Sequence, residues 1–111
     1  MKLTNMPEGV ADWSRMPATT IRGATGTANA RARQVGDLQL RVVEYAPGYL
    51  ADHWCSKGHV MYVITGELTI EHQTDQPAYE LAAGTTWHVG DNEAPPHRVR
   101  SERGATVFIL D

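Results

Sequence analysis

The sequence of 111 residues lacks several features that would assign it to a class. It has one cysteine, Cys55, so an intrachain disulfide is excluded, and a lone thiol suits a reducing compartment. Ten basic and thirteen acidic residues give a formal net charge of -3. This balance lacks the basic excess that nucleic acid or an anionic membrane surface attracts. We therefore expect neither nucleic acid nor a membrane as a partner.

Long apolar runs are also missing. No stretch approaches the length that spans a bilayer, and residues 1–10 carry one lysine without the apolar segment of a secretory signal. These observations predict a cytoplasmic protein. The length fits a single domain, and a hydrophobic content of 41% is ordinary for a globular chain. A small domain often gains stability from a metal ion or a partner subunit.

Room for helices is scarce, because ten glycines and six prolines recur at short intervals. The one candidate for a helical turn is 10–13. Between the breakers, period-two alternation and β-branched apolar runs predict strands at 28–33, 38–42, 60–64, 68–72, 79–81, 86–89, 97–100 and 105–110, with a tight turn at 65–67. Many short strands separated by turn signals predict an all-β sandwich or barrel of antiparallel sheets.

Four side chains that can bind a metal are spaced so that they can converge. His53 and Cys55 are two residues apart and would project to the same side of a strand. A turn at 56–58 could bring His59 back toward the same interior, and His97 arrives from a later strand. Three imidazoles and one thiol predict a site for a divalent metal ion.

This pattern resembles the cupin superfamily. The first cupin motif is a Gly, then His-x-His, three or four residues, Glu, six residues and Gly, and the second runs from a Gly to a ligand His. The matching positions are Gly48, His53, Cys55 in place of the second His, His59 in place of Glu, Gly66, and then Gly84 and His97. Residues 52–55, Asp-His-Trp-Cys, look closest to an uncharacterised group of small cupins whose signature joins Asp, His, Cys and Trp.

The sequence departs from the cupin pattern at several positions. Gly48 lies one residue closer to the first His than the family pattern has it, and Gly90 stands where the second motif has Pro. Two extra residues precede His97, and Ser101 replaces the usual Asn. These departures concern loop conformation more than fold, whereas the substitutions at 55 and 59 put the family's activities in question.

The resemblance implies an architecture and a ligand set. It implies a single jelly-roll-like cupin β-barrel over 26–111, after an N-terminal extension over 1–25 that could supply a strand to a dimer contact. It also implies a homodimer, because small cupins commonly pair through their sheets. The metal ligands that it implies are His53, Cys55, His59 and His97.

The ligand types narrow the choice of metal. The usual cupin set is three imidazoles and one carboxylate, and here a thiolate would replace the carboxylate charge, a form that a nearby dication favours. Sulfur with imidazole favours zinc, with nickel, cobalt or iron as alternatives. The oxygenase arrangement of two His and one carboxylate is disfavoured, because no carboxylate stands at the matching position.

Each candidate also has a structural interpretation. A free cysteine or a lone strand histidine is more often buried or hydrogen-bonded than metal-bound, and only the combination favours a metal site. His72 and His88 lie outside the motif and are interpreted as surface or packing residues. A barrel mouth could use Arg31, Arg33 and Arg41 to bind a carboxylate or phosphate, although a solvent-exposed face is the favoured interpretation for each.

The predicted function is that of a small metal-binding cupin. It is either a metal-dependent enzyme acting on a small polar molecule, or a non-catalytic small-ligand-binding or regulatory cupin in which the metal is structural or absent. The two differ in whether a coordination position stays open to the ligand. No residue is assigned a catalytic role, because fold alone does not define a reaction.

Overall fold

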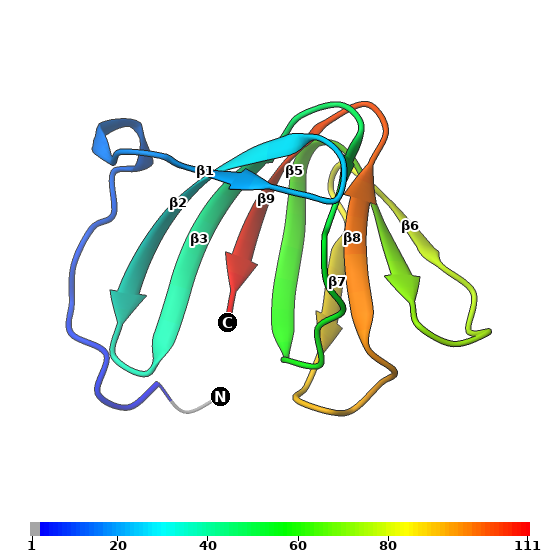
Figure 1. The fold of residues 1–111 in the computed structure, drawn as a ribbon. Coiled ribbons are helices and arrows are strands. Elements are labelled where there is room, and N and C mark those ends of the chain that lie inside the picture. The colour runs from blue at the N-terminus through cyan, green and yellow to red at the C-terminus, as the bar shows by residue number, and fades with distance from the viewer. Residues whose placement is uncertain (1–2) are drawn as a thin grey trace.

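The computed structural model describes residues 3–111, and strands make up nearly all of their regular structure (Figure 1). This confirms the all-β prediction. The elements are the 3-10 helix η1 (Trp13–Arg15) and the strands β1 (Thr19–Arg22), β2 (Thr27–Val35), β3 (Leu38–Tyr45), β4 (Tyr49–Leu50), β5 (His59–His72), β6 (Tyr79–Ala82), β7 (Thr86–Val89), β8 (His97–Ser101) and β9 (Ala105–Leu110).

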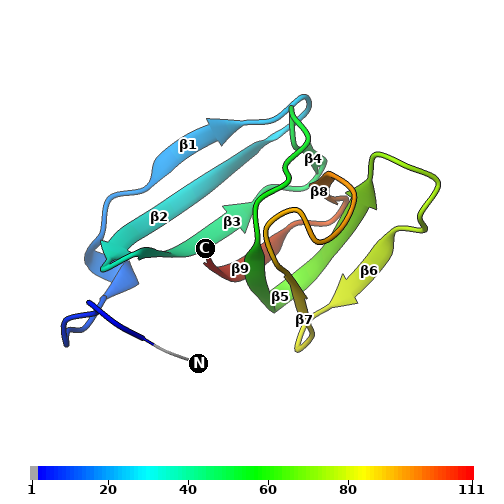
Figure 2. The same cartoon turned by 90° about the horizontal axis from the view of Figure 1, so that it is seen from below.

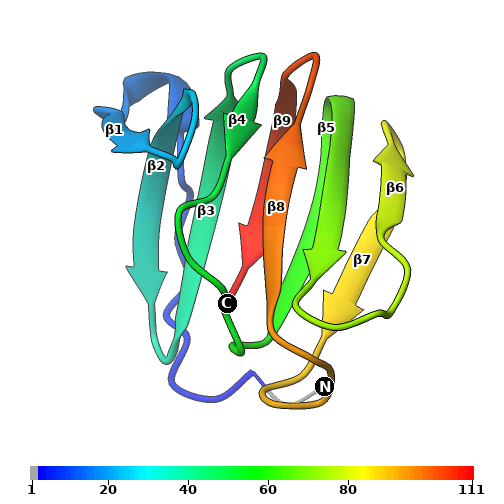
Figure 3. The same cartoon turned by 45° about the vertical axis from the view of Figure 1, so that its right-hand side comes forward.

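The strands form one strongly curled antiparallel sheet in the order β1-β2-β3-β9-β5-β8-β4, with β6 and β7 also paired to β5. Viewed from below, β1, β2, β3 and β9 make one wall, and β8 and β4 lie across the interior from it (Figure 2). Turning the molecule by 45° shows β8 in front of β9 (Figure 3). The arrangement is a cupin-type β-barrel.

Strand β5 belongs to both walls because it bends sharply near its middle. Its first half pairs with β7 and β9, and its second half pairs with β6 and β8. A straight strand of this length would separate its ends by about 43 Å. Instead, His72 pairs with His97 in register, and the His59 ring centroid is 5.2 Å from that of His97. The turn predicted at 65–67 is therefore a bend inside one continuous strand.

Local features explain the bend. The pairing register of β5 with β9 shifts between Val63 and Thr65, and a bulge of this kind bends its strand. Gly66 follows with a φ of 79°, in the left-handed region that glycine tolerates best. The carbonyl oxygen of Gly104 also occupies the space where a Cβ at Gly66 would lie.

Side chains that alternate along the inward sides of the strands form the core. The bulkiest fully buried apolar members are Val43, Val63, Leu68, Ile70, Val107 and Ile109. Truncating such a side chain to alanine typically costs about 2–5 kcal/mol. The same inward rows continue toward the end of the barrel that carries His59 and His97, so the core fixes the position of the candidate site.

The predicted N-terminal extension contributes regular structure. Strand β1 lies within it and pairs in register with β2. Arg33 donates to the carbonyl oxygen of Val10 at 2.6 Å, and Arg31 to that of Met16 at 3.1 Å, which ties this segment to β2. The boundary after residue 25 stays a prediction, and residues 1–2 of the extension lie outside the described residues. None of the helical structure within 3–111 is long and apolar enough to cross a membrane.

Candidate metal centre

Three of the four predicted ligands meet inside the barrel. Cys55, His59 and His97 each offer one ligand atom, and these atoms lie within 4.8 Å of one another. The Sγ of Cys55 is 3.7 Å from the Nε2 of His59. Ligands around a tetrahedral zinc ion lie about 3.4–3.6 Å apart. The three side chains are therefore spaced to hold a metal ion after small adjustments.

Backbone pairing brings Cys55 and His97 together. The amide of Cys55 donates to the carbonyl oxygen of His97 at 2.8 Å, and the amide of His97 donates back at 2.9 Å. This isolated bridge fixes a residue from a loop against the first residue of β8. His59 is the first residue of β5, so all three positions lie at the same end of the barrel.

The structure places His53 differently from the sequence argument. Residues 52–53 form a bend instead of a strand, so the two-residue alternation with Cys55 does not apply. The His53 side chain is 76% exposed, and its Nδ1 lies 2.7 Å from the Oδ1 of Asp52. That hydrogen bond lowers the pKa of Asp52. The assignment of all four residues as metal ligands stays a prediction, with His53 outside the group that meets.

The polar atoms around this group are incompletely satisfied. Four buried side-chain atoms have no hydrogen-bond partner among the described residues: Nε2 of His97, Nδ1 of His59, Oδ1 of Asp111 and Nε of Arg41. An unpartnered buried polar atom costs about 1–3 kcal/mol. The bare Nε2 of His97, beside a second imidazole and a thiol, is the feature that fits a metal ion.

Asp111 is a site residue that sequence reasoning missed. Leu110 pairs with Val60, which puts Asp111 beside His59 at the neighbouring position of the ladder. The Oδ2 of Asp111 is 3.3 Å from the Nδ1 of His59, without the alignment of a hydrogen bond. A carboxylate behind a ligand imidazole orients the ring and raises its basicity. Extending the alternation Val107, Ile109 by two residues would have found it.

The favoured interpretation of Arg41 as solvent-exposed was wrong. Its side chain is 22% exposed and lies inside the barrel, where Nη2 donates to the Oδ2 of Asp111 at 2.9 Å. Both faces of β3 carry apolar residues, so alternation in the sequence could not predict whether the face that carries Arg41 points to the interior or to solvent. Arg31 follows the expectation, because it pairs with the exposed Glu44.

Burial keeps the two imidazoles in the form that binds metal. It lowers the pKa of His97 to about 4, and the neighbouring charges of His59 and His72 act in the same direction. Burial also lowers the pKa of His59, with a smaller lowering from Arg41 that opposes the raising effect of Asp111. Both rings are therefore neutral at pH 7, and metal binding requires no proton release from them.

A cavity of about 170 Å³ opens beside the three residues. Cys55, His59 and His97 line it together with Arg41, Tyr45 and Tyr49, and the two tyrosine rings are tilted to each other with their centroids 4.9 Å apart. His53 also lines it. The cavity gives a small molecule access to the position between the imidazoles and the thiol.

Other polar side chains are not part of the Cys55, His59 and His97 group, although Arg98 lines the same cavity. His72 is buried, with its Nδ1 3.1 Å from the carbonyl oxygen of Pro77, and His88 is exposed. Arg98 and Arg100 both bond the carboxylate of Glu71. The Arg98 guanidinium also stacks on Trp54, 4.4 Å from the ring centroid.

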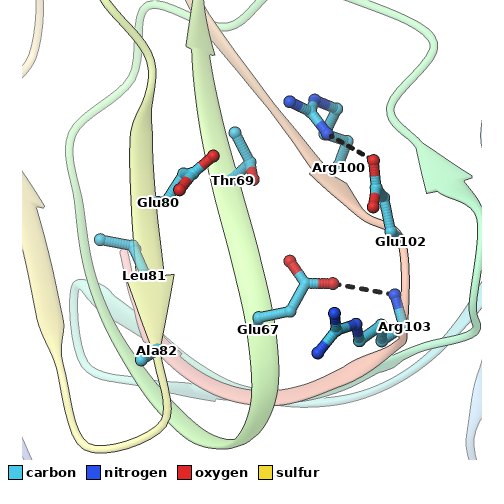
Figure 4. A pocket seen from close by; sticks show the side chains of 8 residues that line it. All are labelled: Glu67, Thr69, Glu80, Leu81, Ala82, Arg100, Glu102 and Arg103. Atoms are coloured by element: carbon cyan, nitrogen blue, oxygen red, sulfur yellow. Dashed lines mark hydrogen bonds and ion pairs between the residues drawn. The ribbon is translucent and has the colours of Figure 1, made fainter.

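A larger hollow of about 410 Å³ lies against β5, β6 and β8 (Figure 4). Its lining is mostly charged and holds neither histidine nor cysteine: Glu67, Thr69, Glu80, Leu81, Ala82, Arg100, Glu102 and Arg103. Glu67 accepts hydrogen bonds from the amide of Arg103 at 2.8 Å and the hydroxyl of Ser101 at 3.2 Å. This hollow therefore lacks the sulfur and imidazole donors that the inner cavity offers.

Comparison with known proteins supports the fold assignment. No protein-family model and no curated protein matches the sequence. Among solved structures, ectoine synthase from P. lautus is similar with a TM-score of 0.72 and 16% identity over 93% of this chain and 76% of that one. A predicted oxalate decarboxylase from Thermotoga maritima gives 0.70 and 12% over 92% and 96%. An RmlC-like cupin from Shewanella frigidimarina gives 0.69 and 18% over 96% and 92%.

These likenesses define the class. The chain has the fold of a small single-domain cupin, as the sequence motifs predicted, and identities below 20% carry the fold and nothing finer. Within that fold, the chain groups Cys55, His59 and His97 as a candidate metal centre.

Proposed function

We propose that this protein is a metal-binding cupin in which Cys55, His59 and His97 hold a divalent transition-metal ion beside a cavity for a small polar molecule. The observation that carries the proposal is the buried, unpartnered Nε2 of His97 next to the other two ligand residues. A neutral imidazole nitrogen in this position gains a strong partner from a metal ion.

Zinc is the metal that the donor set favours. One thiolate and two imidazoles are typical zinc ligands, and nickel, cobalt and iron can also accept them. The Asp111 carboxylate would hold the His59 ring by its Nδ1 side, leaving Nε2 toward Cys55. Oxygen-only ions such as magnesium fit this donor set poorly.

The number of protein ligands decides what the centre can do. If Cys55, His59 and His97 were the only protein ligands, a fourth coordination position would stay open, and the metal could then polarise a carbonyl group or acidify a water molecule. If His53 leaves Asp52 and turns inward, four protein ligands would close the site, and the metal would be structural. We favour the open arrangement, because His53 is exposed and engaged with Asp52.

The alternative is a non-catalytic small-ligand-binding or regulatory cupin. One observation favours it: no Asp or Glu is among the described residues that line the cavity. A general acid or base for hydrolytic chemistry would then have to come from a histidine or a tyrosine. In this alternative the protein binds its ligand at the metal or beside it without turning it over.

Element-resolved metal analysis tests the proposal. Protein purified without chelator should contain close to one equivalent of a transition metal, and Cys55→Ser should weaken zinc binding by about 10-fold or more, because a hydroxyl is a poor replacement for a thiolate. Metal-free protein that takes up no added zinc contradicts the proposal.

His53→Ala is the matched variant for the ligand count. In the cobalt-substituted protein, an open position should bind azide and change the visible spectrum, and His53→Ala should leave both the metal affinity and that change intact. A large loss of metal affinity in His53→Ala would favour the closed, structural site.

A further inference from the structure

We infer that Arg41 makes the cavity a binding site for a small carboxylate, held between the guanidinium and the metal centre. The inference rests on the proposed function for the metal end of the site and on Arg41 for the other. Arg41 lines the cavity from β3, and the Cys55, His59 and His97 cluster lines it from β5, β8 and the preceding loop.

The Arg41 guanidinium has donors to spare. A guanidinium has five N–H groups, and within residues 3–111 the Asp111 carboxylate is the one group that accepts a hydrogen bond from it. Its Nε is buried against the chain and unpartnered, so a ligand in the cavity would be met by the remaining Nη N–H groups. A half-used guanidinium inside a barrel is expensive unless a further acceptor completes it. A carboxylate is the acceptor whose two oxygens match the planar fork.

Two tyrosines add donors of the right kind. Tyr45 and Tyr49 line the same cavity, and neither hydroxyl makes a hydrogen bond to the described residues. Burial raises the pKa of both phenols, which outweighs the opposing effect of the Arg41 charge. Both hydroxyls therefore stay protonated and available to an anion.

The charges in the cavity favour a single negative charge on the ligand. The charges of Arg41 and Asp111 cancel across their ion pair, and Arg98, which also lines the cavity, is paired with Glu71. A dication bound to one thiolate would keep a net charge of one, and no carboxylate among the described residues lines the cavity to neutralise it. A monoanion would complete the balance.

Size and lining narrow the class further. The cavity of about 170 Å³ is smaller than the outer hollow of about 410 Å³ against β5, β6 and β8, so it suits a small ligand. Ile21, Val43, Met61 and Val99 provide apolar wall beside the polar groups. The ligand class is therefore a monocarboxylate of a few non-hydrogen atoms with a short apolar tail.

The first test uses the unmodified protein. Calorimetric titration of the zinc-loaded protein with acetate and propionate should show saturable binding. Acetamide is uncharged and has nearly the same shape, and its affinity should be lower by a factor of about 10 or more. Equal affinity for acetate and acetamide, or binding of neither, overturns the inference.

The second test changes the guanidinium. Arg41→Gln should weaken acetate binding by about 10-fold, whereas azide, which can bind a metal without two parallel N–H donors, should change by less than about 3-fold. Arg33→Gln is the matched control, because Arg33 is exposed on the neighbouring strand and should leave both anions unaffected. Unchanged acetate binding in Arg41→Gln refutes the role of Arg41.

If Arg41→Gln does not fold, Arg41→Lys provides a second variant that keeps the positive charge. It should retain the attraction for Asp111 and lose the fork, so acetate binding should fall while the melting temperature stays close to that of the unmodified protein. Protein that binds zinc but not acetate refutes the inference and leaves the proposed function intact. Protein that binds no metal, yet binds acetate in an Arg41-dependent way, refutes the proposed function and supports the anion site.

Discussion

Two of the hollows in the described part of the chain, the outer one on β5, β6 and β8 and the inner cavity beside Cys55, differ in how their charges are satisfied. The outer hollow is the larger, and the Glu67 carboxylate in it is bonded to the chain around it (Figure 4). The inner cavity is smaller, yet all four buried side-chain atoms without a partner among the described residues belong to residues at or beside it. Size and charge density point to the outer hollow, whereas unsatisfied buried atoms point to the inner one.

The physical reason is the cost of burial. An exposed charge is solvated whether or not it finds a partner, so a surface ion pair such as Arg100 with Glu102 contributes little. A buried imidazole nitrogen or guanidinium N–H without a partner destabilises the folded state. A fold that keeps several such atoms together places them where a ligand can remove the cost.

The largest expected effect is the loss of the centre by one substitution. His97→Gln preserves much of the side-chain volume but removes the ligand nitrogen, and we expect zinc affinity to fall by about 100-fold or more. The matched change in the outer hollow, Glu80→Gln, should leave zinc affinity unchanged. Competition with a chromogenic chelator measures both. Equal zinc affinities in the two variants would show that the inner cavity is no more important for metal binding than the outer hollow.

Asp111→Asn tests the carboxylate behind His59. It keeps the shape and removes the charge, so we expect zinc affinity to fall by about 10- to 100-fold. Glu44→Gln is the control on β3, because Glu44 is exposed and pairs with Arg31 on the surface. The same competition assay applies, and an Asp111→Asn protein with the affinity of the control would show that Asp111 has no part in orienting the ring.

The pH dependence of stability should separate the two regions. The pKa of His97 in the folded protein is about 4, and that of His59 is also lowered. Above the unfolded value of 6.5 both rings are neutral in the folded and the unfolded chain, so they do not make the free energy of unfolding depend on pH. As the pH falls from 6.5 toward 4, the unfolded chain takes up protons first, and metal-free protein should lose about 2 kcal/mol. Denaturant unfolding at a series of pH values measures this loss.

Glu71, on the outer face, should affect the free energy of unfolding at lower pH than the two histidines do. Burial raises its pKa, but hydrogen bonds from Arg98 and Arg100 outweigh this and lower it overall. Its contribution is therefore present above the unfolded value of 4.5 and disappears below it. Glu71→Gln should lower the free energy of unfolding above pH 4.5 by a constant amount and flatten its pH dependence below pH 4.5. A His97→Gln protein should instead flatten the pH dependence between 6.5 and about 4.

The predicted homodimer can be tested with a substitution that should hardly change the stability of the monomer. Val60, Tyr62 and Ile64 expose 39%, 41% and 47% of their surface on the outward side of β5. If a second copy packs there, Tyr62→Lys should shift sedimentation toward the monomer while the free energy of unfolding changes by about 0.5 kcal/mol or less. Glu80→Lys, on β6, should not shift it. A monomeric unmodified protein would contradict the prediction.

Much of the fold was predictable because it depends on local signals. The strand pattern between glycines and prolines predicted seven of the β-strands in outline, and the spacing from Gly48 to Gly66 with His97 predicted a cupin barrel. The short strands β1 and β4 escaped, since neither has enough alternating residues to stand out. Gly66 was correctly marked as special, although a positive φ alone cannot distinguish a turn from a bulge.

The site was predictable only where its residues belong to the motif. Cys55, His59 and His97 were found by spacing, but the argument for His53 assumed a strand that the chain replaces with a bend. Arg41 and Asp111 carry no motif, and their pairing at 2.9 Å arises from two strands that are 70 residues apart. No local rule predicts a contact at that separation.

The amino-acid order by itself determined the all-β class and the supply of one thiol and three motif imidazoles, because turn residues and alternation act over a few positions. The tertiary structure decided which of those side chains share an interior and which point to water. That choice depends on strand register and on the bend in β5, both of which are set by packing across the whole barrel.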